Sequence, residues 1–399
     1  MKKIYHILAL LMISALILTA CGAQATTAPS VPPTAATAEV IKIGGLFDFT
    51  GPVADLGPKF QAGVELALEE VNYTVAGHKI QLLVEDTATS VDVAVEKFKK
   101  LADADGVKIF IGPLMGDAHL AISPLAKEKN VIITSIVNGM YQTVQDGHYL
   151  IYPTTVDAQT YPFGQYAYDT LGYKTAVVVA ADYAGKRGYA AGFIEGFKAS
   201  GGTVVQEIYT PLGSPDYSPF ISTIKEADVV MYALEGPGPV SRFITQFKQT
   251  GRTTPMITIT QDGDYTPEAL AELKDVALGI KGEASYTWKL DNPENKKFVE
   301  GITAKTGRVP SASEQNTYTL TKVVLAGLEK TGGDVSFDKL YPAITSLIMN
   351  TPAGSLSFGK EGIAIPPMYV TEAEKVGDVY EISAPLFTVP QVFDVRVKP

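Results

Sequence analysis

Few residues of this chain have the types and spacing that catalytic chemistry requires. The four histidines form no metal-ligand spacing, and His6 lies within an apolar N-terminal stretch. We expect the others to be surface or hydrogen-bonded residues. The sequence contains no nucleophile elbow, P-loop or dinucleotide-binding glycine motif, and no acidic pair stands out as an acid–base couple. It therefore predicts no enzyme, no cofactor and no metal site, although catalytic carboxylates need not be neighbours in sequence.

Cys21, the only cysteine, has the clearest chemistry in the chain. Two lysines and an apolar stretch up to Ala20 precede it, which is typical of a secretory signal peptide. The ending Leu-Thr-Ala-Cys resembles the lipobox of bacterial lipoproteins, in which the thiol receives a diacylglycerol and the preceding segment is removed. The resemblance implies a lipoprotein signal peptide over 1–20 and lipidation of Cys21. A buried cysteine and a transmembrane anchor are the alternatives, but the apolar stretch is short for a span.

Composition limits the partners of the chain. Its 399 residues suffice for two domains, and 33 basic against 43 acidic residues leave a net charge of −10. An acidic protein repels phosphate backbones, so we expect no nucleic-acid binding. Residues 22–38 have no charge, no aromatic residue and three prolines. They bury too little apolar surface to fold alone, so the sequence predicts a flexible tether over 21–39.

From Val40 onward, short apolar runs alternate with stretches of helical spacing. Strands are predicted at 40–47, 80–84, 107–112 and 131–134, with helices at 61–72, 91–102 and 119–129 between them. The same alternation returns from 176 to 259, with one helix predicted at 217–226. Strand-rich residues follow from 356 to 397. Alternation without hairpin signals predicts an α/β protein with two parallel sheets wrapped by helices.

The opening of this folded part resembles a known family. Its features include Ile41-Lys42-Ile43-Gly44, Thr50-Gly51-Pro52, Gly63, Asp86, Ile111-Gly112-Pro113, Asp182-Tyr183 and Asp216-Tyr217-Ser218. In this order and spacing they resemble the type I periplasmic solute-binding proteins of ABC transporters, in the leucine/isoleucine/valine-binding branch. The resemblance covers the chain from Val40 to its C-terminus.

The resemblance implies a clamshell of two doubly wound Rossmann-like lobes joined by a three-segment hinge. The N-terminal lobe would comprise 40–155 and 288–353, and the C-terminal lobe 156–287 and 354–399. Crossings are expected near 152–157, 283–288 and 351–358. A small solute would bind in the cleft, hinge closure would bury it, and the closed form would dock on the membrane permease. The protein would be a monomer, lipid-anchored in the periplasm or on the outer face of the membrane.

Positions that match the family's contacts to a ligand carboxylate can be carried over one by one. The first carboxylate slot falls on Gly116, with Asp117 beside it, and a second falls on Asn138. A backbone carbonyl for the ligand amine falls on Ile136, and the first-loop aromatic slot falls on Leu56. Turn, cap or core roles are the alternatives at these positions. Because Gly116 has no hydroxyl, and a carboxylate at 117 would repel an anion unless it points away or is protonated, the carboxylate contact departs from the family pattern.

The remaining slots concern the ligand amine and the second lobe. The acid that pairs with the ammonium falls at Asp262, and Glu235 or Gly236 occupies another slot. The aromatic positions are Tyr183 and Tyr318, for which core packing is the alternative. The implied ligand is a branched-chain amino acid, and an amide or cationic solute fits as well. A ligand-sensing receptor of the same fold that transports nothing is the alternative function.

Overall fold

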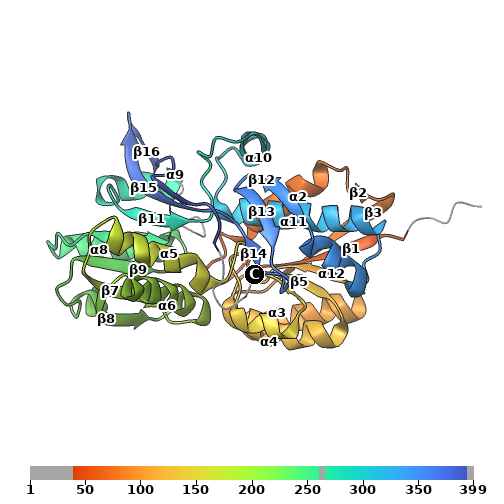
Figure 1. Cartoon of the computed structure of the whole chain (residues 1–399), viewed down its shortest axis with the longest axis horizontal. Coiled ribbons are helices and arrows are strands. Elements are labelled where there is room, and N and C mark those ends of the chain that lie inside the picture. The colour runs from red at the N-terminus through yellow and green to blue at the C-terminus, as the bar shows by residue number, and fades with distance from the viewer. Residues whose placement is uncertain (1–38, 260–264, 266, 393–399) are drawn as a thin grey trace, which may run out of the picture. The chain divides into compact units, whose positions relative to one another are not determined.

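Strands and helices alternate in the structure as the sequence pattern predicts. The computed structural model describes residues 39–259, 265 and 267–392. Within residues 39–392 it has two lobes, each built around its own largely parallel sheet (Figure 1). The predicted α/β fold of two doubly wound lobes is confirmed. No helix in the described ranges has the length and apolar character that crossing a membrane requires.

The sheet of the first lobe has the strand order β2-β3-β1-β4-β5-β6. Its parallel strands are β1 (Ile41–Phe47), β3 (His78–Asp86), β4 (Ile109–Ile111), β5 (Ile132–Thr134) and β6 (Tyr149–Leu150). The short β2 (Thr74–Val75) pairs antiparallel with β3, a hairpin that the sequence pattern missed. The helical elements of this lobe are α2 (Gly57–Glu69), α3 (Val91–Lys99), η1 (Lys100–Ala104), α4 (Gly116–Lys129), η2 (Tyr141–Asp146), α10 (Pro293–Thr306), α11 (Ala312–Thr331) and α12 (Phe337–Thr345).

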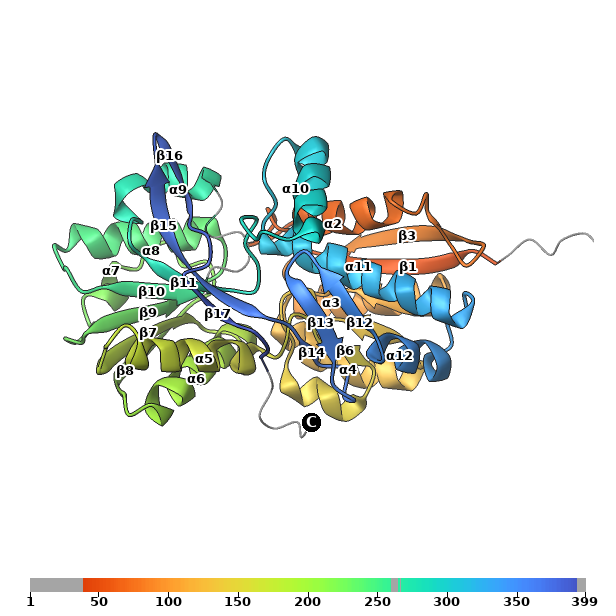
Figure 2. The ribbon, with the colours of Figure 1, turned by 45° about the horizontal axis from the view of Figure 1, so that its top comes forward.

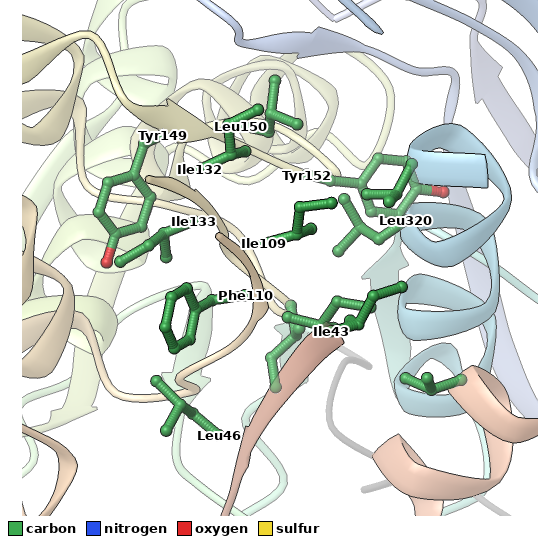
Figure 3. Close-up of a cluster of buried hydrophobic side chains, with 14 of the residues drawn as sticks. Ile43, Leu46, Ile109, Phe110, Ile132, Ile133, Tyr149, Leu150, Tyr152 and Leu320 are labelled. Carbon is green, nitrogen blue, oxygen red and sulfur yellow. The ribbon is translucent and has the colours of Figure 1, made fainter. Parts of the chain in front are cut away.

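Helices cover both faces of this sheet. Helices α2, α11 and α12 lie on one face, and α3 and α4 on the other (Figure 2). Ser311 caps α11 through a capping box with Glu314. Between these layers, strand residues such as Ile43, Ile109 and Ile133 are fully buried together with Leu320 of α11 (Figure 3). This core holds the loops at the carboxyl ends of the strands in place.

The sheet of the second lobe has the strand order β16-β15-β11-β10-β9-β7-β8. Its parallel strands are β7 (Thr175–Ala181), β8 (Thr203–Thr210), β9 (Val229–Ala233), β10 (Met256–Ile259) and β11 (Lys281–Ala284). β15 (Met368–Val376) pairs antiparallel with β11, and β16 (Val379–Ile382) and β17 (Phe387–Val389) pair with β15. The helical elements are α5 (Val156–Asp169), α6 (Ala184–Ala199), α7 (Ser218–Ile221), α8 (Pro237–Gln249), α9 (Pro267–Leu273) and η3 (Lys274–Val276).

Side-chain alternation divides the core of the second lobe between the two faces of its sheet. Val177 and Val179 pack with residues of α7, α8 and α9, whereas Val178 and Ala180 pack with residues of α5 and α6. Helix α7 is much shorter than the helix predicted over 217–226, since residues 222–226 of that range are turn or irregular.

A small antiparallel sheet corrects the predicted division of the chain. It consists of β12 (Ile348–Thr351), β13 (Gly354–Phe358) and β14 (Ala364–Ile365). Leu356 and Ala364 belong to the core of the first lobe, and the Ala364 N–H donates to the Ile151 carbonyl at 2.9 Å. The assignment of 354–365 to the C-terminal lobe is therefore wrong, and the third crossing follows Ile365. A pattern of short strands does not say which sheet they join.

Candidate functional site

Loops at the carboxyl ends of the parallel strands bring residues of the two lobes together. Open α/β sheets bind ligands at this edge. The first lobe contributes the loops after β4 and β5, and the second those after β7 and β9. They line a pocket that includes Leu114, Gly116, His119, Val137, Asn138, Val156, Tyr183, Gly185, Tyr189 and Glu235. Four of the predicted site residues thus meet here: Gly116, Asn138, Tyr183 and Glu235.

The pocket is almost filled by its own walls. The space that remains is about 10 Å³, which suits about one water molecule. A Cβ atom on Gly116 would lie 3.0 Å from the Gly185 nitrogen and 3.1 Å from the Met140 sulfur. A side chain at position 116 would therefore crowd the Gly185 backbone and the Met140 side chain, which would have to shift by a few tenths of an ångström. A solute larger than water needs the walls to move before it can enter.

Two helix N-termini face each other across this pocket. Helix α4 begins at Gly116 and α6 at Ala184, and no side chain caps α4 from the Met115 position. The first N–H groups of a helix have no intrahelical acceptor, and its N-terminal end carries partial positive charge. Helix ends of this kind favour an anion beside them. The backbone at Gly116 can therefore attract a carboxylate although the residue has no hydroxyl.

Asp117 lies at the edge of the pocket. Its Oδ2 accepts a hydrogen bond from the Ala184 N–H at 3.3 Å, so the carboxylate of one lobe lies at the N-terminus of α6 in the other. Asp117 is not among the residues that line the pocket. Its carboxylate adjoins the lining residues Tyr183 and Gly185 through this hydrogen bond. It links the two lobes.

Asn138 lies at the contact between the lobes. It has a left-handed backbone conformation (φ 60°) and is 1% exposed. Its Nδ2 donates to the Thr154 carbonyl at 3.0 Å and to Gln159 Oε1, while its Oδ1 accepts from the Tyr189 hydroxyl at 2.7 Å. The side chain therefore joins the loop after β5 to α5 and α6. The carbonyl of nearby Ile136 accepts from Asn316 Nδ2 at 2.9 Å and faces α11.

A buried charge cluster forms the second-lobe wall. Glu235 Oε2 accepts from the Tyr183 hydroxyl and lies 3.1 Å from Lys186 Nζ. The side chains of Lys186 and Glu235 are each 1% exposed. Sequence reasoning missed Lys186. Its position one helical turn after Tyr183, with Tyr189 a further turn on, was the available signal, because residues three apart share a helix face.

A second buried network extends from Asn138 towards the lobe crossings. Gln159 Nε2 donates to both carboxylate oxygens of Glu283, at 2.8 and 2.7 Å. Burial raises the pKa of the Glu283 carboxyl well above its usual range, and the Gln159 hydrogen bond and the Lys186 charge oppose this only in part. Gln159 follows the first crossing, and Glu283 precedes the second. No sequence signal pointed to either residue.

The other predicted site residues do not line the pocket. Leu56 is buried in the first-lobe core at the start of α2, and the Tyr318 hydroxyl donates to Glu70 at 3.1 Å beside Phe298. Gly236 precedes α8 and adjoins the pocket only through Glu235. Asp262 and Cys21 lie outside the described residues.

The described ranges contain no candidate metal site. No group of three or more His, Cys, Asp or Glu residues among them is arranged to hold a metal ion.

Comparison with known proteins identifies the fold and the kind of site. The family model for periplasmic binding proteins matches residues 40–378. The chain belongs to the periplasmic binding protein family. This is a family of substrate-binding proteins rather than enzymes, and its members bind small molecules.

Two relatives of this periplasmic binding protein have names that mention amino acids. Leu/Ile/Val-binding protein homolog 6 of Brucella abortus is 28% identical over 358 residues, which cover 88% of this chain and 91% of the relative. The leucine-, isoleucine-, valine-, threonine-, and alanine-binding protein of Pseudomonas aeruginosa is 24% identical over 330 residues, which cover 82% of this chain and 87% of the relative.

Several similar solved structures contain an aromatic acid. One of them is the solute-binding protein of an ABC transporter from Rhodopseudomonas palustris BisB5 in complex with 3,4-dihydroxybenzoic acid. Its TM-score is 0.83 at 25% identity, and the match covers 90% of this chain and 99% of that one.

Proposed function

We propose that this protein is the extracytoplasmic, lipid-anchored solute-binding component of an ABC importer. It captures a small polar solute, an amino acid of the branched-chain type or an amide, and hinge closure buries the solute between the lobes. The closed form then delivers it to the permease. The observation that carries the proposal is the pocket whose walls come from strand ends of both lobes.

The charges of the pocket favour a zwitterion. The N-terminus of α4 presents partial positive charge to a ligand carboxylate. Glu235, on the opposite wall, keeps its ion pair with Lys186 and is proposed to accept the ammonium group as well. Asp262 remains a second proposed partner for the ammonium group. The relatives named for leucine, isoleucine and valine support this ligand class. A dihydroxybenzoate, as in the Rhodopseudomonas protein, shares the carboxylate but has no ammonium group.

The cellular setting of the proposal rests on the sequence. Residues 1–20 are removed as a signal peptide, Cys21 carries the lipid, and residues 21–39 are the tether. Two or three acyl chains are enough for stable anchoring, whereas one chain is marginal. The protein acts as a monomer, in the periplasm or on the outer face of the membrane. The lipid keeps it close to its permease.

The proposal is tested by ligand identification followed by titration. Mass spectrometry of material released from the purified protein names any bound solute. Calorimetric titration then compares leucine, isoleucine, valine, threonine, acetamide and 3,4-dihydroxybenzoate. We expect binding of at least one amino acid or amide. Absence of a co-purified solute together with no binding in the titrations refutes the proposal.

A charge variant separates the ligand classes. Glu235→Gln should weaken an amino acid about 10-fold or more, because hydrogen bonds to charged groups are the stronger ones. It should not weaken a benzoate, which has no ammonium group. Glu207→Gln is the matched control, since Glu207 lies in the same lobe and accepts only an exposed hydrogen bond from Tyr209. Equal loss for both ligand classes contradicts the assignment of Glu235.

A further inference from the structure

His119 is a pocket residue that no sequence motif singled out. It lies at the end of the first turn of α4, is 1% exposed, and lines the pocket beside Leu114 and Gly116. Its Nε2 lies 2.8 Å from the Pro113 carbonyl oxygen. Because a carbonyl oxygen only accepts, Nε2 carries the hydrogen.

The imidazole of His119 is neutral at physiological pH. Burial lowers its pKa to about 4, and the hydrogen bond to Pro113 and the charge of Asp117 oppose this only in part. A neutral ring with its hydrogen on Nε2 has a lone pair on Nδ1. Nδ1 is therefore a hydrogen-bond acceptor.

That acceptor has no partner among the protein atoms of the described ranges. His119 is hydrogen-bonded through Nε2, as expected, but its Nδ1 is buried there without a hydrogen bond. The centroid of the neighbouring Tyr149 ring lies 5.5 Å from that of the His119 ring, but the Tyr149 hydroxyl makes no hydrogen bond to Nδ1. That hydroxyl also lacks a described partner. Buried polar atoms in native proteins are almost always satisfied, so an orphan beside a pocket needs an explanation.

We infer that His119 Nδ1 accepts a hydrogen bond from the bound solute. The inference rests on the proposed function and narrows its ligand class. The solute carries an N–H or O–H donor that faces the first lobe, in addition to the carboxylate at the helix ends. A purely aliphatic side chain leaves Nδ1 unsatisfied, whereas a hydroxyl or amide side chain satisfies it. The apolar neighbours Leu114 and Val137 accommodate the small hydrocarbon part of such a side chain.

Isosteric ligand pairs test this inference directly. Threonine and valine have nearly the same shape, and so do asparagine and leucine, but only the first member of each pair has a side-chain donor. We expect the wild-type protein to prefer the donor-bearing member of at least one pair by about 10-fold or more. Calorimetric titration of each ligand gives the ratio of dissociation constants.

Two variants of His119 distinguish its two nitrogens. His119→Gln keeps an N–H close to the position of Nε2 but removes the acceptor, whereas His119→Asn keeps an acceptor close to the position of Nδ1. We expect His119→Gln to abolish the preference and His119→Asn to retain most of it. Thermal unfolding of both variants checks that the fold persists.

The outcomes separate the inference from the proposed function. If the ligands bind but His119→Gln leaves the ratio of dissociation constants within each ligand pair unchanged, the inference is overturned while the proposed function stands. The same holds if both variants lower only the unfolding temperature, because Nδ1 then serves the fold, through a buried water shared with Tyr149. No binding of any amino acid, amide or benzoate, with nothing co-purified, refutes the proposed function itself.

Discussion

Tyr189→Phe should weaken ligand binding by removing one hydrogen bond between the lobes. The Tyr189 hydroxyl of α6 donates to Asn138 Oδ1, in the loop after β5, at 2.7 Å. Both residues are buried, at 2% and 1% exposure. Phenylalanine keeps the ring, over which Lys186 Nζ lies 5.1 Å from the centroid. The substitution therefore removes the hydroxyl with little change in packing.

The size of the effect follows from the burial of the acceptor. Leaving a buried amide oxygen without its hydrogen-bond donor destabilises that conformation by about 1–3 kcal/mol. In a conformation with the lobes apart, water can reach Asn138 and the cost disappears. The penalty thus falls on the closed form alone, and the dissociation constant should rise about 5- to 150-fold.

Calorimetric titration with the co-purified ligand measures this change. Tyr209→Phe is the control, because the Tyr209 hydroxyl bonds only to Glu207 of its own strand, at 2.8 Å. We expect its dissociation constant to equal that of the wild type. If Tyr189→Phe also binds within about twofold of the wild type, the contact between Tyr189 and Asn138 does not stabilise the ligand-bound form, and the reasoning fails.

Three further predictions concern stability and anchoring. Burial raises the pKa of Glu283, so the native state binds more protons than the unfolded state above about pH 4.3 and the wild type loses stability as pH rises. The free energy of unfolding of Glu283→Gln should therefore rise relative to that of the wild type by up to about 1.4 kcal/mol per pH unit between pH 5 and 8, as measured by urea unfolding. A difference between the two free energies that does not change with pH contradicts this. Gly63→Ala places a Cβ 2.2 Å from the Glu314 carbonyl and should lower the unfolding temperature by several degrees, whereas Gly238→Ala meets nothing within 4 Å and should not. Cys21→Ser should abolish labelling by radioactive fatty acid and release the protein from membranes with its ligand affinity unchanged; retained labelling excludes Cys21 as the lipid site.

Local periodicity predicted most of the fold because strands and helices bury their apolar faces with different spacings. The run 176–180 is apolar throughout and the run 40–47 is apolar except for Lys42, as in strands with both faces covered, and the structure has parallel strands there. Local periodicity could not predict which sheet the C-terminal strands join. The strands at 354–358 and 364–365 join the first lobe through contacts with Ile151, more than two hundred residues earlier.

The pocket was predictable only in part. Gly116, Asn138, Tyr183 and Glu235 were found by carrying over the contact positions of the family that the chain resembles, and in the structure they lie where parallel strands end at one edge of their sheet. Residues on helices and within strands were missed, notably Lys186, Gln159, Glu283 and His119. Their partners are distant in sequence, as in the bond between Gln159 and Glu283 across 124 residues. No local pattern encodes such a pairing.

The sequence alone determined the α/β alternation and the two units, because these follow from the spacing of apolar residues and from the position of turns. The loops that carry the site came from the resemblance to the family. The sequence also carries the prediction for Cys21. Only the tertiary structure decided what the side chains of the site do: that Asp117 turns towards α6, that Lys186 pairs with Glu235, and that His119 leaves one nitrogen without a described partner. The physical reason is that burial and hydrogen-bond partners are set by elements that meet only after folding.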